Sequence, residues 1–239
     1  MNLQNPLTQV LHTTRMLKVR CKEDTSIEAG IDEAGRGCLW GPLYAAAVIW
    51  PSMEEMSDDQ IKVASQIKDS KKLTPKRRTA LAEQIKEIAV SYGVGSVNAK
   101  EIDEIGITKS NQLAFTRALN NLDMDYQPER LLIDGLLSIY DQPWSMIEQI
   151  VEPELDNTYI SVAAASILAK TEHDIWVTDF CDLNTNIAET YGFRNHKGYG
   201  TAKHRTAVLE HGTLADHRAL FLRKLFAGKS VKGDSSLEL

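Results

Sequence analysis

Residues 30–37 read Gly-Ile-Asp-Glu-Ala-Gly-Arg-Gly, and the rest of the chain is best interpreted outward from them. An apolar strand end is followed by two adjacent acids, Asp32 and Glu33. Oxygen ligands of this kind are what hard divalent cations prefer. The glycines beside Arg36 lack a Cβ and let the backbone approach a ligand, while the guanidinium matches a phosphate with a planar fork of donors. The stretch therefore predicts metal-dependent phosphodiester chemistry. An exposed acidic turn is the alternative, and the apolar run Leu43–Trp50 that follows makes it less favoured.

Composition predicts an intracellular protein with a full hydrophobic core. The chain has 239 residues, 43% of them hydrophobic, which suits one domain with a subdomain or two small domains. No apolar run reaches the ~18 residues of a membrane span, and polar residues interrupt the stretch 7–17 where a signal peptide would lie. Cys21, Cys38 and Cys181 are far apart and odd in number, which predicts reduced thiols and a cytoplasmic location.

The charge distribution permits binding to nucleic acid although the net charge is -6. Residues 191–232 carry nine Lys or Arg against two acids, and a second basic cluster spans 68–78. Most charge runs are solvated faces, which is the alternative reading. A basic tract near an acidic metal site would instead hold a phosphate backbone.

Hydrophobic patterns predict a mixed sheet with a helical C-terminal part. Early neighbouring strands suit hairpins, whereas later strands separated by helices suit parallel crossovers. A helix should begin at Thr74-Pro75, and a closely packing helix should cover the small residues 161–170. Another helix should run from Thr201 to His211 and stop at Gly212, and a helix is also expected between the last two strands. The expected strands are 28–31, 43–50, 91–97, 131–135 and 145–151.

Asp134 ends an apolar strand before a glycine, as Asp32 does. If the two strands are parallel neighbours, their ends lie about 5 Å apart. Two carboxylates at that spacing could share one cation or flank two ions ~4 Å apart. Mg²⁺ fits such a site, and zinc does not because no histidine pair has ligand spacing.

Five motifs in order resemble the signature of ribonuclease HII, the type 2 ribonuclease H family. Each motif alone is weak, but the ordered set is specific. The resemblance covers residues 27–222. The motifs are Ile31–Gly37 with Gly41-Pro42 and Ala45–Ile49, then Asp69–Leu73, Leu132–Gly135, Ala163–Lys170, and Tyr191–His204 with His217-Arg218 after it.

The resemblance implies an α/β ribonuclease H-like fold, with a mixed five-stranded sheet flanked by helices and a helical C-terminal segment. On this basis we expect an N-terminal extension at 1–26, a catalytic domain at 27–190, a helical substrate-binding segment at 191–227 and a polar tail at 228–239.

The resemblance also implies four catalytic, metal-binding acids holding two Mg²⁺ or Mn²⁺ ions. Three fall on Asp32, Glu33 and Asp134. The fourth acid of the family lies ten residues before the serine of its alanine-rich run, which leads from Ser166 to Asp156. Asp174 is the rival, and we interpret it as a solvated helix acid or an ion-pair partner.

Substrate contacts follow from the same resemblance. Gly35, Arg36 and Gly37 would recognise the 2′-hydroxyl and phosphate of a ribonucleotide, and Tyr199 would pack on the following deoxyribose; without the surrounding motif, Tyr199 would be an ordinary half-buried tyrosine. Further candidates for phosphate contacts are Lys71, Lys72, Arg194 and Lys197. The chain departs from the family pattern at Cys38, Trp40, His173 and Ala219.

The implied activity is metal-dependent endonucleolytic hydrolysis. The substrates would be the RNA strand of RNA/DNA hybrids and the phosphodiester 5′ to a single ribonucleotide in duplex DNA, as in ribonucleotide excision repair. We expect a monomer that leaves 3′-hydroxyl and 5′-phosphate ends. Two alternatives stay open: a nuclease or integrase with the same acids but no ribonucleotide requirement, and a catalytically silent nucleic-acid-binding protein.

Overall fold

A five-stranded mixed sheet forms the centre of the computed structural model, which describes residues 16–68, 70 and 73–227. The strand order is β3-β2-β1-β4-β5. The first three strands pair antiparallel, whereas β1–β4 and β4–β5 pair in parallel. The expected mixed sheet is therefore confirmed. The strands are β1 Glu28–Ala34, β2 Leu43–Ile49, β3 Ser91–Val97, β4 Arg130–Asp134 and β5 Glu148–Glu152.

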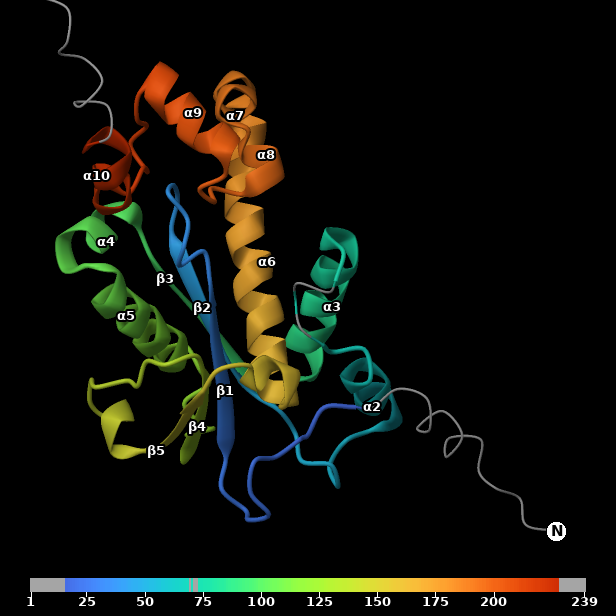
Figure 1. Cartoon of the computed structure of the whole chain (residues 1–239). Coiled ribbons are helices and arrows are strands. Elements are labelled where there is room, and N and C mark those ends of the chain that lie inside the picture. The colour runs from blue at the N-terminus through green and yellow to red at the C-terminus, as the bar shows by residue number, and fades with distance from the viewer. Residues whose placement is uncertain (1–15, 69, 71–72, 228–239) are drawn as a thin grey trace, which may run out of the picture.

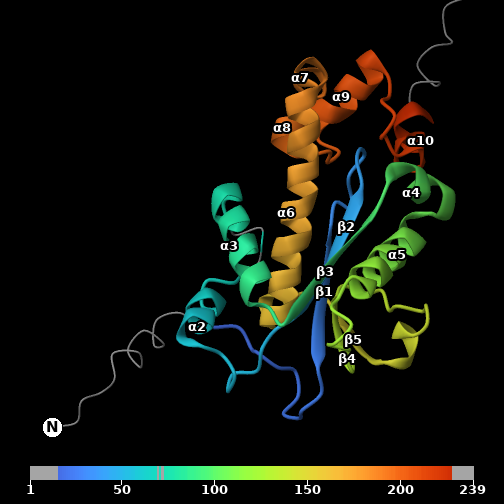
Figure 2. The same cartoon turned by 180° about the vertical axis from the view of Figure 1, so that it is seen from behind.

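Helices cover both faces of this sheet. The long helix α6 lies along one face with α3 and α2 beside it, and α5 lies on the other (Figure 1). Helices α7 to α9 gather at the C-terminal end of α6, whereas α10 lies beside α4, as the view from behind also shows (Figure 2). The helices are α2 Asp58–Ala64, α3 Pro75–Ile88, α4 Ala99–Ile105, α5 Ile107–Asn120, α6 Ile160–Leu183, α7 Thr185–Tyr191, α8 Phe193–His196, α9 Ala202–His211 and α10 Ala219–Ala227.

Small residues let α6 lie directly on β1. A Cβ on Gly30 would stand 2.3 Å from the backbone carbon of Ser161, closer than any side chain tolerates. The alanines Ala163, Ala164 and Ala165 on the helix are fully buried. The prediction that this small-residue segment forms a closely packing helix is confirmed.

Two helix starts and one helix end are where the sequence placed them. Thr74 caps α3 by accepting a hydrogen bond from the Arg77 amide, and Pro75 occupies the first helical position. Thr201 caps α9 through the His204 amide, and the helix ends at Gly212 with a positive φ of 84°.

Three expectations about the strands are corrected. β1 does not end before the acids: its antiparallel ladder with β2 continues through Asp32 and Glu33 to Ala34. No helix joins β4 to β5, because the short connection starts at a positive-φ glycine and contains Pro143, which has no N–H; it forms only the 3₁₀ turn Trp144–Met146. β5 consequently begins at residue 148 rather than 145.

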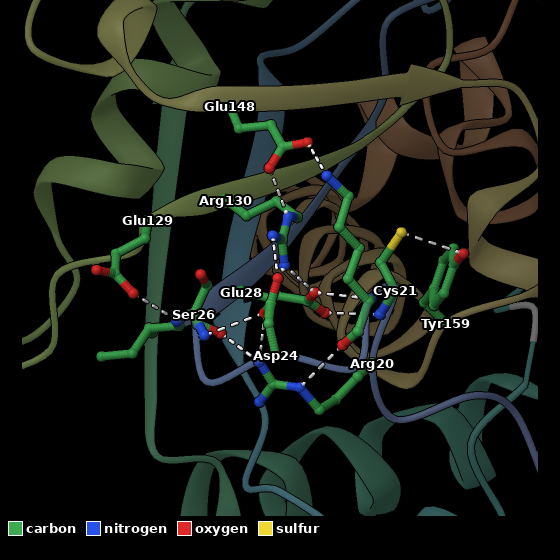
Figure 3. Close-up of polar contacts among 11 residues, drawn as sticks. Arg20, Cys21, Asp24, Ser26, Glu28, Glu129, Arg130, Glu148 and Tyr159 are labelled. Atoms are coloured by element: carbon green, nitrogen blue, oxygen red, sulfur yellow. Dashed lines mark hydrogen bonds and ion pairs between the residues drawn. The ribbon is translucent and has the colours of Figure 1, made fainter.

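Residues 16–27 pack where β1 and β4 begin, at the end of the sheet opposite Asp32. The Lys18 carbonyl accepts from the Ile160 amide at the start of α6. Arg130 on β4, whose side chain is 5% exposed, binds Asp24, Glu28 and Glu148, and Figure 3 shows these carboxylates converging on its guanidinium. A cavity of 680 Å³ lies at this same end of the sheet, away from the acids expected to be catalytic.

No helix in the described ranges is both long enough and apolar enough to span a bilayer.

Candidate active site

Asp32 and Asp134 lie side by side where the parallel ladder between the neighbouring strands β1 and β4 ends. Their strands are parallel neighbours in which Ile31 pairs with Ile133, so the two acids occupy the next position along each strand. Side chains alternate along a strand, and both acids fall on the face that Gly30 presents to α6. Tertiary structure thus joins two residues that are about a hundred positions apart in the chain.

The electrostatics of Asp32 favour a bound cation. Burial, together with the charges of Glu33 and Asp134, raises the pKa of Asp32 well above its ordinary value. A hydrogen bond from the Ser166 hydroxyl and one from the Glu33 amide, at 2.7 Å, oppose this rise. A divalent cation between these carboxylates would relieve their repulsion, so the residues fit the ion that their composition predicts.

Asp156 lies beside this pair. It is 4% exposed on a 3₁₀ turn, Leu155–Asn157, just before α6. The amide of Leu155 donates to Asp134 at 2.8 Å, which anchors the turn to the end of β4. The turn that carries Asp156 is thus attached to Asp134, while the role of Asp156 as a metal ligand stays a prediction.

Glu33 occupies a different face. Because it follows Asp32 directly within β1, strand alternation directs it away from α6. Its carboxylate lies 3.9 Å from the Arg36 guanidinium. Within the described ranges, no three His, Cys, Asp or Glu side chains stand in a metal-binding arrangement.

The glycine turn after β1 is held by Arg218, which the motif pattern included without a role. Arg218 is fully buried and donates to the carbonyl of Gly41 and the carbonyl of Arg36, both at 2.9 Å. Gly35 adopts a positive φ of 81°, and a Cβ there would stand 2.5 Å from the His173 ring. Arg36 itself remains 45% exposed at its side chain and is available to a ligand. The His-Arg pair at 217–218 was the available signal for this buried support.

Tyr199 lies beside this turn. Its backbone forms a bridge with Cys38, and the residue is 36% exposed. Burial raises the pKa of Tyr199 to about 12, so the phenol is neutral near pH 7. The Nζ of Lys170 stands 5.2 Å from the ring centroid. The structure thus brings Tyr199 and the glycine turn together, as both substrate-contact hypotheses require.

Asp174, the rival fourth acid, is an ion-pair partner. Its carboxylate binds Arg78 at 2.7 Å and Lys170 at 2.8 Å, and its side chain is 16% exposed. Burial would raise the pKa of Asp174, but hydrogen bonds from His173 and Lys170 lower it to about 2. A carboxylate already neutralised by two cations has little left to offer a metal.

The other basic candidates are spread more widely. Lys197 donates to Thr178 at 3.0 Å and helps line a hollow of 230 Å³ between α3 and α6. Arg194 pairs with Asp182 at 2.7 Å near the end of α6. Lys71 and Lys72 lie outside the described residues.

Three of the four departures from the family pattern, Cys38, Trp40 and His173, are buried near the glycine turn, whereas Ala219 is exposed at the start of α10. Trp40 is fully buried and stacks on Phe193 with ring centroids 3.9 Å apart, so it supports the C-terminal helices rather than lining a groove. Cys38 lies 3.6 Å from Nε2 of His173, and both side chains are buried. Burial raises the pKa of Cys38 to about 12, which makes it an inert thiol.

A second missed residue is Ser166, a polar side chain within the alanine-rich face of α6. Its hydroxyl bonds to Asp32 and lies 3.0 Å from the hydroxyl of Ser70. A serine directly after three buried alanines was the available signal.

The chain is similar to known proteins over most of its length. The family model described as Ribonuclease HII matches residues 29–229. Ribonuclease HII of Bacteroides thetaiotaomicron is 41% identical over 216 residues, covering 89% of this chain and 94% of the relative. Ribonuclease HII of Synechococcus sp. (strain RCC307) is 40% identical over 210 residues, covering 88% and 98%. The crystal structure of ribonuclease H2 from Pyrococcus horikoshii OT3 aligns with a TM-score of 0.65 at 25% identity, covering 84% of this chain and 97% of that one.

Proposed function

Because the chain belongs to the ribonuclease HII family and is therefore a ribonuclease H endonuclease, we propose that it hydrolyses the RNA strand of RNA/DNA hybrids and the phosphodiester 5′ to a single ribonucleotide in duplex DNA. The products would be 3′-hydroxyl and 5′-phosphate ends. Such a cut would begin ribonucleotide excision repair, carried out by a cytoplasmic monomer.

One observation carries the proposal: Asp32 and Asp134 lie side by side near the carboxyl ends of β1 and β4, and the glycine turn follows β1 directly. Acids that repel each other need a cation, and a backbone turn with an exposed arginine beside them can hold the phosphate that the cation would polarise. A protein that only bound nucleic acid would gain nothing from clustered negative charge near phosphate.

Each group of residues has a distinct part in the proposed reaction. Asp32, Glu33, Asp134 and Asp156 would hold two Mg²⁺ or Mn²⁺ ions, which supply an activated water and stabilise the departing 3′ oxygen. Ser166 orients Asp32 through its hydroxyl.

Recognition of the substrate falls to the turn and its neighbour. Gly35 and Gly37 would offer backbone groups to the 2′-hydroxyl, which distinguishes RNA from DNA at one position, and Arg36 would bind the phosphate. Tyr199 would cover the apolar face of the next sugar. Lys71, Lys72, Arg194 and Lys197 would contact the backbone further along, and Lys197 already lines the hollow between α3 and α6.

Cleavage of three labelled duplexes with Mg²⁺, each with and without EDTA, tests the proposal. The duplexes are DNA with one embedded ribonucleotide, a long RNA/DNA hybrid, and DNA alone. We expect EDTA-sensitive cutting of the hybrid, and of the first duplex on the 5′ side of its ribonucleotide. Cutting of all-DNA duplex would show that no ribonucleotide is required.

Two further outcomes would overturn parts of the proposal. Cutting of the long hybrid alone would remove the recognition of single ribonucleotides while leaving the acid site. Binding of all three duplexes without cleavage, with Mn²⁺ also tried, would favour a silent nucleic-acid-binding protein.

A further inference from the structure

One face of α6 carries a charged pair next to Tyr199. Lys170 and Asp174 are one helical turn apart, and Nζ lies 2.8 Å from the carboxylate. The same Nζ stands over the Tyr199 ring at 5.2 Å from its centroid. Both charged side chains are largely buried, at 21% and 16% exposed. The pair is therefore more than a solvated helix ion pair, because its cation has a second partner.

Asp174 holds the lysine in this place. Its carboxylate also accepts hydrogen bonds from Arg78 on α3 and from Nδ1 of His173, at 2.7 and 3.3 Å. Arg78 is itself buried and donates to the Ser70 carbonyl at 3.1 Å. Three donors from two helices thus fix the carboxylate, and the carboxylate fixes the ammonium group.

The Tyr199 ring has two close neighbours and is still partly accessible. The Lys170 ammonium stands over the ring, and the centroid of the His173 ring is 6.1 Å from the Tyr199 centroid. The residue as a whole nevertheless remains 36% exposed. A cation over an aromatic face holds the ring by attraction to its π-electrons, and this attraction strengthens when both groups are shielded from water.

We propose that Lys170, held by Asp174, is a positioning residue that fixes the Tyr199 ring against the sugar following a ribonucleotide and so favours ribonucleotide–DNA junctions over continuous RNA. This inference rests on the proposed function. It assigns Asp174 to recognition of the junction, through Lys170, rather than to the metal. Continuous RNA should be affected less, because the next sugar there carries a 2′-hydroxyl that an aromatic ring covers poorly.

Three variants separate this role from simple helix stability. Lys170→Met removes the charge and keeps the length of the side chain, while Lys170→Arg keeps a cation that can bind both the carboxylate and the ring. Lys86→Met is the matched control, because Lys86 binds Glu172 of the same helix at 2.9 Å and has a similar exposure of 22%. Thermal melting would verify that each variant is folded.

Steady-state kinetics on the single-ribonucleotide duplex and on the long hybrid give the first readout. In Lys170→Met we expect KM for the single-ribonucleotide duplex to rise about tenfold with kcat nearly unchanged. KM for the hybrid should move far less. Lys170→Arg should recover most of the loss, and Lys86→Met should behave as wild type on both substrates.

Hydroxyl-radical footprinting of Tyr199, read by peptide mass spectrometry, gives a second readout that needs no substrate. Oxidation of Tyr199 should rise in Lys170→Met and stay at the wild-type level in Lys170→Arg and Lys86→Met. Equal loss on both substrates with unchanged footprinting would overturn the inference and leave Lys170 a structural residue. If wild type cleaves no duplex, the proposed function fails, and the footprint alone then decides whether Lys170 positions the ring.

Discussion

At the scale of single residues, burial and neighbouring negative charges disfavour the charged form of Asp32. It is buried next to two other acids, and among the described residues the Ser166 hydroxyl and the Glu33 amide stabilise its charged form by hydrogen bonding. Asp134 on the neighbouring strand contributes to this repulsion, and its carboxylate also anchors the turn that carries Asp156. One carboxylate thus serves both the candidate metal site and the local structure.

Asp134→Asn should separate catalysis from binding. The amide keeps the size of the side chain and can still accept from the Leu155 amide, but it removes the charge that would hold a cation. We expect cleavage of the single-ribonucleotide duplex to fall on the order of 10²-fold or more while duplex affinity in the presence of Ca²⁺ is retained. Glu152→Gln is the control, because Glu152 is the exposed register partner of Asp134 on β5. Normal turnover by Asp134→Asn would remove this residue from the site.

At the scale of elements, the contact between α6 and β1 decides where the acids and the tyrosine lie relative to one another. The helix brings Ser166 to Asp32 near its middle and Lys170 to Tyr199 one turn later. Any displacement of α6 would therefore disturb both regions at once. Gly30 permits this contact because nothing larger fits between the strand and the helix.

Gly30→Ala should destabilise the protein by about 3 kcal/mol, because the new methyl group meets helix backbone that cannot rotate away. Urea denaturation followed by tryptophan fluorescence would measure the loss. Gly37→Ala is the control for stability, since no atom lies within 4 Å of a Cβ built there. Equal midpoints for the two variants would show that the helix can move without cost.

A neutral histidine pair joins α9 to the loop before α10. The Leu214 amide donates to Nδ1 of His217, so the His217 proton is on Nε2 and is donated to Nε2 of His204 at 3.1 Å. His204 then donates from Nδ1 to the Tyr199 carbonyl at 3.0 Å. Burial lowers the pKa of both rings to about 4. In the unfolded chain the two histidines bind a proton each near pH 6.5, whereas in the folded chain they do so only near pH 4. The stabilisation of the folded state by the neutral pair is therefore present above pH 6.5 and is lost as pH falls towards 4.

His217→Gln should flatten that pH dependence. Between pH 7.5 and 4.5, the free energy of unfolding should fall by roughly 2 kcal/mol less in the variant than in wild type, as urea titrations at each pH would show. His211→Gln should keep the wild-type slope, because the His211 side chain is 52% exposed. If the free energy of unfolding had the same pH dependence in wild type and in both variants, the role given to the buried histidine pair would be contradicted.

At the scale of the whole molecule, the two ends of the central strands have different roles. The end with Asp32 and Asp134 carries the candidate chemistry. At the opposite end, where β1 and β4 begin, Arg130 joins the segment 16–27 to β1 and β5 through three carboxylates, one of them the buried Glu28 (Figure 3). Stability and proposed activity can therefore be altered separately.

Arg130→Met should destabilise the protein by about 3–5 kcal/mol, because Glu28 would keep a buried charge without its cation. Hydrogen exchange should also become faster in residues 16–27, whereas the proposed cleavage should persist below the melting temperature. Arg117→Met is the control: its pair with Glu101 is 39% and 29% exposed, and its loss should cost less than about 1 kcal/mol. A loss of similar size in both variants would refute the role given to Arg130.

Local patterns were sufficient to predict much of the fold. Alternation and apolar runs located all five strands, and cap residues such as Thr74 and Thr201 located two helix starts, because these signals act over a few neighbouring residues. The motif order predicted the family. Strand ends were less accurate, since the ladder between β1 and β2 extends further than the apolar run.

What the sequence determined by itself was the set of chemical groups and their order along the chain. Only the tertiary structure decided which of them meet. Register between parallel strands places Asp134 beside Asp32, the packing of α6 against α3 neutralises Asp174 with Arg78, and a buried Arg218 supports the glycine turn from 182 residues away. These contacts depend on the relative placement of distant elements, which is set by the packing of the whole core and leaves no periodic signal in the residues themselves.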